Sequence, residues 1–133
     1  GETTAAEAME IARKLIGALS YIGVMGVEMF HLETEGALVV NEIAPRVHNS
    51  GHWTQDGCAV SQFEQHIRAI TGWPLGDPAR HADTQMLNLI GDDAHNWQAF
   101  AQDAKCHVHL YGKKEARPGR KMGHVNRIRA LSR

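Results

Sequence analysis

Two apolar segments, residues 23–30 and 38–44, constrain this chain most, because each contains one carboxylate that strand propensity alone would not place there. A turn rich in Glu, Thr and Gly separates them, and it fits a three-residue hairpin loop that ends at Gly36. Such a loop places Glu28 directly opposite Glu42. Opposed side chains in an antiparallel pair have Cβ atoms roughly 4.5–5.5 Å apart, and like charges repel there. We therefore expect a divalent cation with oxygen ligands between them, and magnesium carrying a nucleotide is the simplest choice.

The alternative is that both acids simply face solvent. The sequence favours the cation, because the residues expected on the face of Glu28 and Glu42 are apolar or small. They are Val24, Gly26, Leu38, Val40 and Ala44. Asn41 and Asn49 would add oxygen ligands at the same end. A shift of one residue in register would put the two carboxylates on opposite faces, so the hypothesis depends on the register.

The bulk properties indicate one ordinary domain or parts of two small ones, because the chain has 133 residues of which 43% are hydrophobic. No apolar run approaches the roughly 20 residues that cross a bilayer, and the first residues show no signal-peptide pattern. Cys58 and Cys106 lack a metal-binding spacing. We expect two reduced thiols in a cytoplasmic protein that binds no membrane.

The basic residues concentrate near the end of the chain. Residues 105–133 contain nine Lys and Arg against one acid, Glu115, so this part carries +8 and the first 104 residues carry −9 of the net −1. The dense basic residues flank a Pro-Gly turn. They are Lys113, Lys114, Arg117, Arg120 and Lys121. Such a turn suits a phosphate group better than a nucleic-acid duplex, which a basic helix or an aromatic-studded sheet would bind. For the last residues the alternative is a solvated tail.

Local patterns predict the remaining elements. A capping box at 4–7 begins a helix over about 4–19, with Met9, Ile11, Ala12, Leu15, Ile16 and Leu19 on its apolar face. Residues 45–57 are predicted to be a loop after Pro45. A second capping box at 61–64 begins a helix that runs to about Thr71, ends at Gly72 and buries Phe63, Ile67 and Ile70.

A linker at 73–78 separates a second, β-rich part of the chain. We predict strands at 85–91, 106–111 and 121–128 and a short helix at 94–102. His107 and His109 are expected to share one face of their strand as half-buried histidines.

The loop after the second carboxylate is rich in polar and cationic groups that suit anion recognition: Arg46, His48, Asn49, Ser50 and His52. The alternative is a loop whose Asn, Ser and Gly only satisfy turn geometry. Zinc is disfavoured, because no Cys or further His has a matching spacing. The sequence has neither a Walker or Rossmann glycine loop nor a serine nucleophile elbow.

The segment Asn-Glu-Ile-Ala-Pro-Arg-Val-His-Asn-Ser-Gly-His-Trp-Thr at 41–54 resembles the signature of the 5-(carboxyamino)imidazole ribonucleotide synthases, which are ATP-grasp enzymes of purine biosynthesis. Residues 61–70 and 111–124 continue the similarity. The resemblance implies an α+β fold. Residues 1–74 would be the second half of an ATP-grasp core, an antiparallel hairpin with packing helices. Residues 75–133 would be a small β-rich C-terminal domain, which we expect to be truncated. The N-terminal part of such an enzyme is missing, so the fragment alone is expected to be inactive.

The resemblance also implies the reaction and the residue roles. The family uses ATP and bicarbonate, through carboxyphosphate, to carboxylate aminoimidazole ribonucleotide. Glu28 and Glu42 would bind magnesium, or manganese in its place, and Asn41 and Glu42 would lie at the nucleotide. Three loop residues would bind bicarbonate and substrate and act in catalysis: Arg46, His48 and Asn49. Lys113 and Arg120 would bind the ribonucleotide phosphate, and the role of His52 stays open.

The resemblance further implies a cytoplasmic homodimer that binds no nucleic acid. Two other functions remain open at this point. One is another ATP-grasp carboxylate–amine ligase, such as a formate-dependent transformylase. The other is a non-catalytic assembly module whose basic region contacts a phosphate-bearing partner.

Overall fold

The computed structural model describes residues 2–132, which form two compact units. The N-terminal unit contains the chain up to Gly51 together with Gln62–Gly76, and the C-terminal unit contains His52–Ser61 and the chain from Asp77 onward. The mixture of helices and small antiparallel sheets confirms the α+β prediction. The domain limits 1–74 and 75–133 stay predictions. The segment between Gly51 and Gln62 nevertheless packs with the C-terminal unit.

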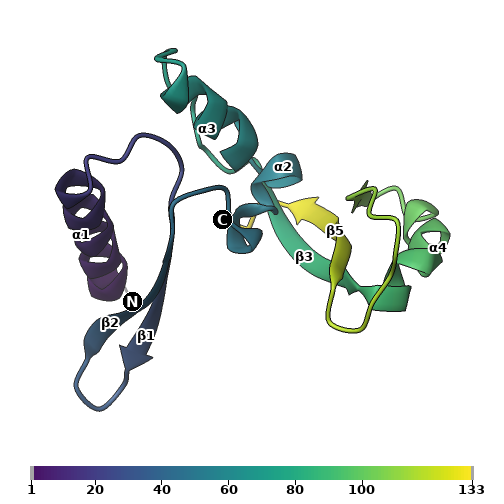
Figure 1. Cartoon of the computed structure of the whole chain (residues 1–133), viewed down its shortest axis with the longest axis horizontal. Helices are drawn as coiled ribbons and strands as arrows, with labels where there is room; N and C mark the ends of the chain where they lie inside the picture. The colour runs from purple at the N-terminus through teal and green to yellow at the C-terminus, as the bar shows by residue number, and fades with distance from the viewer. Residues whose placement is uncertain (1, 133) are drawn as a thin grey trace. The chain divides into compact units, whose positions relative to one another are not determined.

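In the N-terminal unit, helix α1 (Glu2–Ala18) lies beside the hairpin of β1 (Gly26–Leu32) and β2 (Ala37–Ala44) (Figure 1). The helix confirms the prediction within two residues at each end. Its half-buried stripe includes Ile11, Ala12 and Leu15, as expected. The expectation was wrong for Met9, Ile16 and Leu19, which are exposed. Within the described residues of this unit, the helix packs mainly against β2.

The hairpin register confirms that Glu28 pairs with Glu42, although the route differs from the expected one. The turn has four residues, since Leu32 pairs with Ala37 and the Leu32 carbonyl accepts a hydrogen bond from the Gly36 amide at 2.8 Å. A β-bulge then makes Asn41 the extra residue of β2. The longer turn and the bulge each shift the register by one residue and cancel at the carboxylates.

The bulge changes which residues share a face with the carboxylates. Beyond it Phe30 pairs with Val39, so strand alternation puts Val39 on the face of Glu28. The expectation was therefore wrong for Leu38 and Val40, which lie on the other face. Phe30 and Val39 are both exposed in the chain as described, 58% and 47%.

Helix α3 (Gln62–Ile70) begins and ends close to the predicted bounds, and Gly72 follows it with a φ of +72°. The expected burial of Ile67 and Ile70 was wrong, because both are exposed. The helix is held instead by polar contacts within the unit. The Val24 amide donates to His66 Nδ1 at 3.0 Å, and Gln65 exchanges two hydrogen bonds of 2.9 Å with the backbone of Gly76.

The C-terminal unit is built on a three-stranded antiparallel sheet of order β3–β5–β4, which confirms the three predicted strands. Their bounds are Ala82–Ile90 for β3, Cys106–Leu110 for β4 and Lys121–Ala130 for β5. The helix predicted at 94–102 is shorter: α4 spans Trp97–Ala101 after a 3-10 helix, η2, at Gly91–Asn96. The loop predicted at 45–57 contains a 3-10 helix, η1 (Asn49–Gly51), and helix α2 (Thr54–Gly57).

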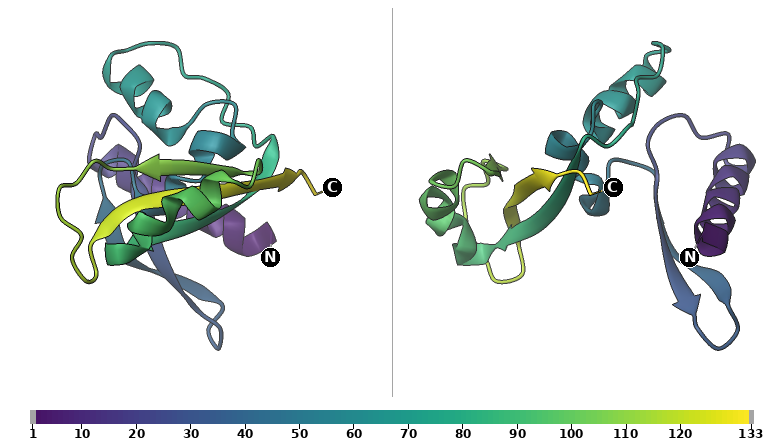
Figure 2. Two further views of the ribbon diagram at one scale, coloured as in Figure 1. Left: turned by 90° about the vertical axis from the view of Figure 1, so that its right-hand side faces the viewer. Right: turned by 180° about the vertical axis from the view of Figure 1, so that it is seen from behind.

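The two faces of this sheet differ in polarity. Helix α4 packs against β4, and Figure 2 shows it lying along the sheet. Helix α2 packs against β3 and β5. The register puts His107 opposite Asn126 and His109 opposite His124, so the four polar side chains share a face, which confirms the prediction for the two β4 histidines. Val125 and Leu89 lie on the other face and are 2% and 1% exposed.

Among residues 2–132, none of the helices has both the length and the apolar content that a membrane span requires.

Gly123 permits the close approach of β4 and β5, because a Cβ at this position would lie 2.5 Å from the His109 carbonyl oxygen. We predict that Gly123→Ala lowers the free energy of unfolding by about 1–3 kcal/mol, since a buried strand must move to admit the methyl group. Urea unfolding followed by circular dichroism measures this change. Gly17→Ala is the control: Gly17 lies in α1 with open space around its Cα, so stability should stay equal or rise. Equal effects of the two substitutions would contradict the packing argument.

Candidate functional site

In the N-terminal unit the opposed carboxylates lie next to His48. The Glu28 side chain is 48% exposed, and its Oε1 is 3.4 Å from Nε2 of His48, whose own side chain is 13% exposed. Gly26, two residues before Glu28, allows this contact, because a Cβ there would be 2.8 Å from the Cβ of His48. The structure thus brings together Glu28, Glu42 and His48, three of the residues that the sequence predicted.

Gln62 fixes the backbone of His48 and was missed by the sequence reasoning. Its Oε1 accepts from the His48 amide at 2.9 Å and its Nε2 donates to the His48 carbonyl at 2.8 Å. The side chain is buried, and Gly51 packs against it without room for a Cβ. Ser50 Oγ is 2.8 Å from His48 Nδ1 and orients the ring. No spacing rule links positions 48 and 62, and in the sequence Gln62 indicates only the start of a helix.

The other predicted loop residues lie close in sequence to His48, but their side chains differ in exposure and in hydrogen bonding. Arg46 is exposed, and its guanidinium donates to the Val47 carbonyl at 2.9 Å. Asn49 has a buried Oδ1 without a hydrogen-bond partner among the described residues. A buried amide oxygen of this kind suits a ligand donor or a cation. Asn41 is exposed at the bulge beside Glu42.

The donor set fits a magnesium–nucleotide site better than a closed protein cage. Within the described part of the chain, no three His, Cys, Asp or Glu side chains are grouped so that they could hold a metal ion. Magnesium needs fewer protein ligands, because it commonly binds through one or two carboxylates and completes its shell with waters and phosphate oxygens. Glu28 and Glu42 can supply those carboxylates.

The predicted phosphate-binding residues lie in the connection between β4 and β5. Lys113 Nζ donates to the Lys121 carbonyl at 2.6 Å, and the Arg120 guanidinium donates to the Glu115 carbonyl at 3.2 Å. Both side chains come from exposed residues of the C-terminal unit. A cavity of about 240 Å³ adjoins this connection, and its lining includes Lys113 and Trp97. The connection therefore presents the ammonium group of Lys113, held by a hydrogen bond, to a space in which an anion could bind.

A buried polar cluster lies between α2 and the polar face of the sheet, and the sequence reasoning missed its centre, Asp56. One Asp56 oxygen is 2.8 Å from His109 Nε2 and accepts from Asn126 Nδ2 at 2.7 Å. The other is 3.5 Å from His107 Nδ1. His124 stacks on His109 with ring centroids 4.6 Å apart. Asp56 is 51 residues from His107, so only the fold brings them together.

The position of His124 changes its acidity. The side chain is 1% exposed. Burial, together with neighbouring His109 and His52, lowers the pKa of His124 from 6.5 to about 4, although Asp56 acts in the opposite direction. The ring is therefore neutral near pH 7. Burial also raises the pKa of the Tyr111 hydroxyl, which lies 2.9 Å from His124 Nδ1.

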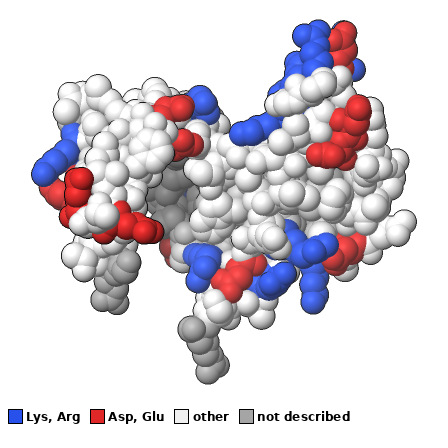
Figure 3. Space-filling model, turned by 90° about the horizontal axis from the view of Figure 1, so that it is seen from below, with Lys and Arg blue, Asp and Glu red and all other residues white. Residues whose placement is uncertain are grey.

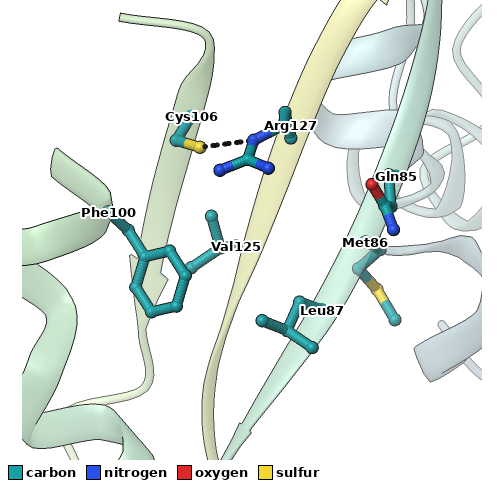
Figure 4. Close-up of a pocket in the computed structure, with 7 residues that line it drawn as sticks. All are labelled: Gln85, Met86, Leu87, Phe100, Cys106, Val125 and Arg127. Carbon is teal, nitrogen blue, oxygen red and sulfur yellow. Dashed lines mark hydrogen bonds between the residues drawn. The ribbon is translucent and has the colours of Figure 1, made fainter. Parts of the chain in front are cut away.

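The opposite face of the sheet has a smaller cavity, of about 120 Å³, that none of the predicted site residues line (Figure 4). Figure 4 shows Phe100 and Val125 beside it and the Arg127 guanidinium donating to Cys106 Sγ, at 3.3 Å. Arg127 also pairs with Asp103 at 3.3 Å. These contacts bind the end of β4 to β5.

Charged side chains of both signs are mixed on the face that Figure 3 shows, where Lys and Arg alternate with Asp and Glu. Several of the basic side chains in the sequence are paired, for example Arg117 with Glu115 at 2.6 Å and Arg80 with Asp83 at 3.0 Å.

Comparison with known proteins defines the class first. The model of the ATP-grasp domain matches residues 1–63. The model of the phosphoribosylaminoimidazole carboxylase C-terminal domain matches residues 84–131. The two matches fall on the carboxylate hairpin and on the three-stranded sheet. The chain is thus of the ATP-grasp class.

Relatives give the family. The chain is 58% identical over 126 residues to an N5-carboxyaminoimidazole ribonucleotide synthase of Brucella melitensis, covering 95% of this chain and 34% of the relative. The Escherichia coli synthase is 48% identical over 122 residues, with 91% and 33% covered. The Aspergillus clavatus synthase complexed with ATP matches with a TM-score of 0.89 and 40% identity, over 97% of this chain and 35% of that one. The chain belongs to the N5-carboxyaminoimidazole ribonucleotide synthase family, and it spans about a third of the length of these relatives.

The lowered pKa of His124 predicts how stability changes with pH. Between pH 6.5 and about 4 the unfolded chain takes up a proton that the folded chain excludes, so folding stability falls as the pH falls through this range. The loss attributable to His124 is up to about 3 kcal/mol, because each pKa unit corresponds to about 1.4 kcal/mol.

Urea unfolding of the chain and of its His124→Gln variant, at several pH values from 7 to 4.5, measures this contribution. The stability difference between the two proteins should shrink as the pH falls, since only the wild-type chain has this titration. Parallel pH profiles of the two proteins would contradict the assignment.

Proposed function

We propose that this chain acts as the C-terminal part of an enzyme that uses ATP and bicarbonate to carboxylate aminoimidazole ribonucleotide, forming the N5-carboxyamino product in purine biosynthesis. The observation that carries the proposal is the pairing of Glu28 with Glu42 beside His48, within a chain that matches synthases of this name over almost its whole length. A solved relative is in complex with ADP and 5-aminoimidazole ribonucleotide, with a TM-score of 0.85 and 41% identity.

Glu28 and Glu42 are proposed to hold a magnesium ion that carries the nucleotide phosphates. The two carboxylates would repel each other without a cation, and their oxygens are the hard ligands that magnesium prefers. Bound magnesium would neutralise charge on the phosphates of ATP. The exposed amide of Asn41, at the bulge, is proposed to lie at the same nucleotide.

Arg46, His48 and Asn49 are proposed to bind bicarbonate and the reacting amine. The exposed guanidinium of Arg46 suits a carboxylate or a bicarbonate oxygen. The buried Asn49 Oδ1 can accept a hydrogen bond from the substrate amine. Gln62 fixes the backbone of His48, and Ser50 contacts its Nδ1. The Nε2 atom is therefore directed to Glu28, one of the two carboxylates proposed to bind magnesium.

Lys113 and Arg120 are proposed to bind the phosphate of the ribonucleotide. Each already donates to a backbone carbonyl, which holds the cationic groups at defined places in the β4–β5 connection. Phosphate would add charge-assisted hydrogen bonds at these positions.

We also propose that the whole protein has an N-terminal part like that of the relatives, that it forms a homodimer and that it is cytoplasmic. The coverage of about a third of each relative supports the first point, because the rest of an ATP-grasp site must come from other residues. Both cysteines of the chain are free thiols, which suits a reducing compartment. We expect neither nucleic acid nor membrane among its partners.

A direct assay of the reaction uses a full-length protein in which an N-terminal part, like that of the relatives, precedes this chain. Phosphate release from ATP should require aminoimidazole ribonucleotide and bicarbonate together, and formate should not replace bicarbonate. Release that depends on formate instead would favour a transformylase. ATP cleavage that ignores both would contradict the proposal.

Substitution of the carboxylates tests their role in the same full-length protein. Glu28→Gln and Glu42→Gln should each lower kcat by about two orders of magnitude, because metal stabilisation of the phosphate charge amounts to several kcal/mol. The magnesium concentration needed for half-maximal rate should rise. Glu33→Gln is the matched control, since Glu33 is an exposed acid in the turn of the same hairpin, and it should leave both values unchanged.

Full activity of both carboxylate variants would contradict the metal assignment. If Lys113→Ala abolished function while both carboxylate variants retained it, the chain would instead act as a phosphate-binding assembly module.

A further inference from the structure

Three histidine rings form a stack in the C-terminal unit. His124 lies in the middle, with ring centroids 4.6 Å from His109 and 5.0 Å from His52. Tyr111 closes the edge of the stack, at 6.2 Å from the His52 ring and nearly perpendicular to it. His52 belongs to the family motif, yet the roles proposed above leave it without one.

Hydrogen bonds fix the stack at His109, at the central His124 and at the backbone of His52. Asp56 holds His109 Nε2 at 2.8 Å and is itself held by Asn126, which is 0% exposed. In the middle of the stack the Tyr111 hydroxyl is 2.9 Å from Nδ1 of His124. Asn126 also donates to the backbone carbonyl of His52, at 3.1 Å. The position of the Tyr111 ring is therefore set by its contact with the buried His124.

The ammonium group of Lys113 lies over the ring of Tyr111. Its Nζ is 5.4 Å from the Tyr111 centroid, within the range of a cation–π contact, and donates to the Lys121 carbonyl. The Tyr111 amide also donates to the Met122 carbonyl, at 2.9 Å, which fixes the backbone two residues before Lys113. A lysine side chain has many rotamers, so a fixed ring under its ammonium group removes much of that freedom before a ligand binds.

We propose that Tyr111 is a positioning residue for Lys113, and that His124 and His52 support it. The hydroxyl of Tyr111 bonds to the buried His124, His52 packs against both rings, and the Tyr111 ring sets the place of the ammonium that receives the substrate phosphate. This inference rests on the proposed function, in which Lys113 binds that phosphate.

A purely structural role for the stack would have a different signature. Loss of packing would lower stability and affect all substrates alike, because the whole unit would loosen. Positioning of Lys113 affects only the substrate whose phosphate Lys113 binds. The KM for aminoimidazole ribonucleotide, compared with the KM for ATP, therefore separates the two roles.

The test uses the full-length protein and three substitutions. Tyr111→Phe keeps the ring and removes its hydroxyl, Tyr111→Leu removes the ring as well, and Lys113→Ala removes the ammonium. Tyr21→Phe is the matched control, because Tyr21 is the chain's other tyrosine and its hydroxyl donates to a backbone carbonyl, that of Val24, at 3.1 Å. Circular dichroism confirms that each variant is folded.

We expect Tyr111→Phe to raise the KM for aminoimidazole ribonucleotide about threefold to fivefold, the usual effect of one lost hydrogen bond. Tyr111→Leu should raise it more, since the cation–π contact is lost too. The KM for ATP should stay within about twofold, as should both values for Tyr21→Phe. In the Lys113→Ala background, Tyr111→Leu should add little, because the group that it positions is absent.

Three results would overturn the inference. If Lys113→Ala leaves the KM for aminoimidazole ribonucleotide unchanged, the proposed role of Lys113 fails and the inference fails with it. If Lys113→Ala raises this KM but Tyr111→Leu adds its full effect in that background, Lys113 keeps its role and the positioning by Tyr111 fails. Equal changes in both KM values for the Tyr111 variants would assign the stack to stability alone.

Discussion

The repulsion between two opposed carboxylates is the constraint on which the N-terminal unit depends. Glu28 and Glu42 face each other across an antiparallel pair, where strand packing alone would favour apolar side chains. The hairpin tolerates this pair at an exposed edge, where His48 Nε2 lies 3.4 Å from Glu28 Oε1. A bound cation resolves the repulsion. The loop that holds His48 is then part of the same electrostatic arrangement.

The C-terminal unit depends on a different constraint, because it buries a polar face of its sheet. Helix α2 contributes Asp56, and the carboxylate satisfies groups on β4 and β5 at once. Buried polar groups cost free energy unless they are paired, so such a network fixes one arrangement of the strands. Tyr111, at the start of the β4–β5 connection, is joined to this sheet face by the contact of its hydroxyl with His124. The connection can therefore present cations at fixed positions although it is exposed.

The sequence predicted the secondary structure of both units well, because capping residues, glycines and alternation act locally. It also predicted the Glu28–Glu42 pair, although by a cancellation: the turn is one residue longer than expected, and the bulge at Asn41 compensates. A bulge has no distinctive residue pattern here, so the faces beyond it were assigned wrongly. The supporting residues Gln62 and Asp56 could not be found, because each acts on groups far away in the sequence that only the tertiary fold brings near.

A crystal structure of the full-length protein with ADP and manganese, a magnesium substitute with a strong anomalous signal, tests the central claim most directly. The account predicts one anomalous peak bonded to carboxylate oxygens of both Glu28 and Glu42 and to a nucleotide phosphate, at the short distances typical of hard oxygen ligands. A metal bound with the nucleotide elsewhere, while the two carboxylates contact only solvent or His48, would contradict it.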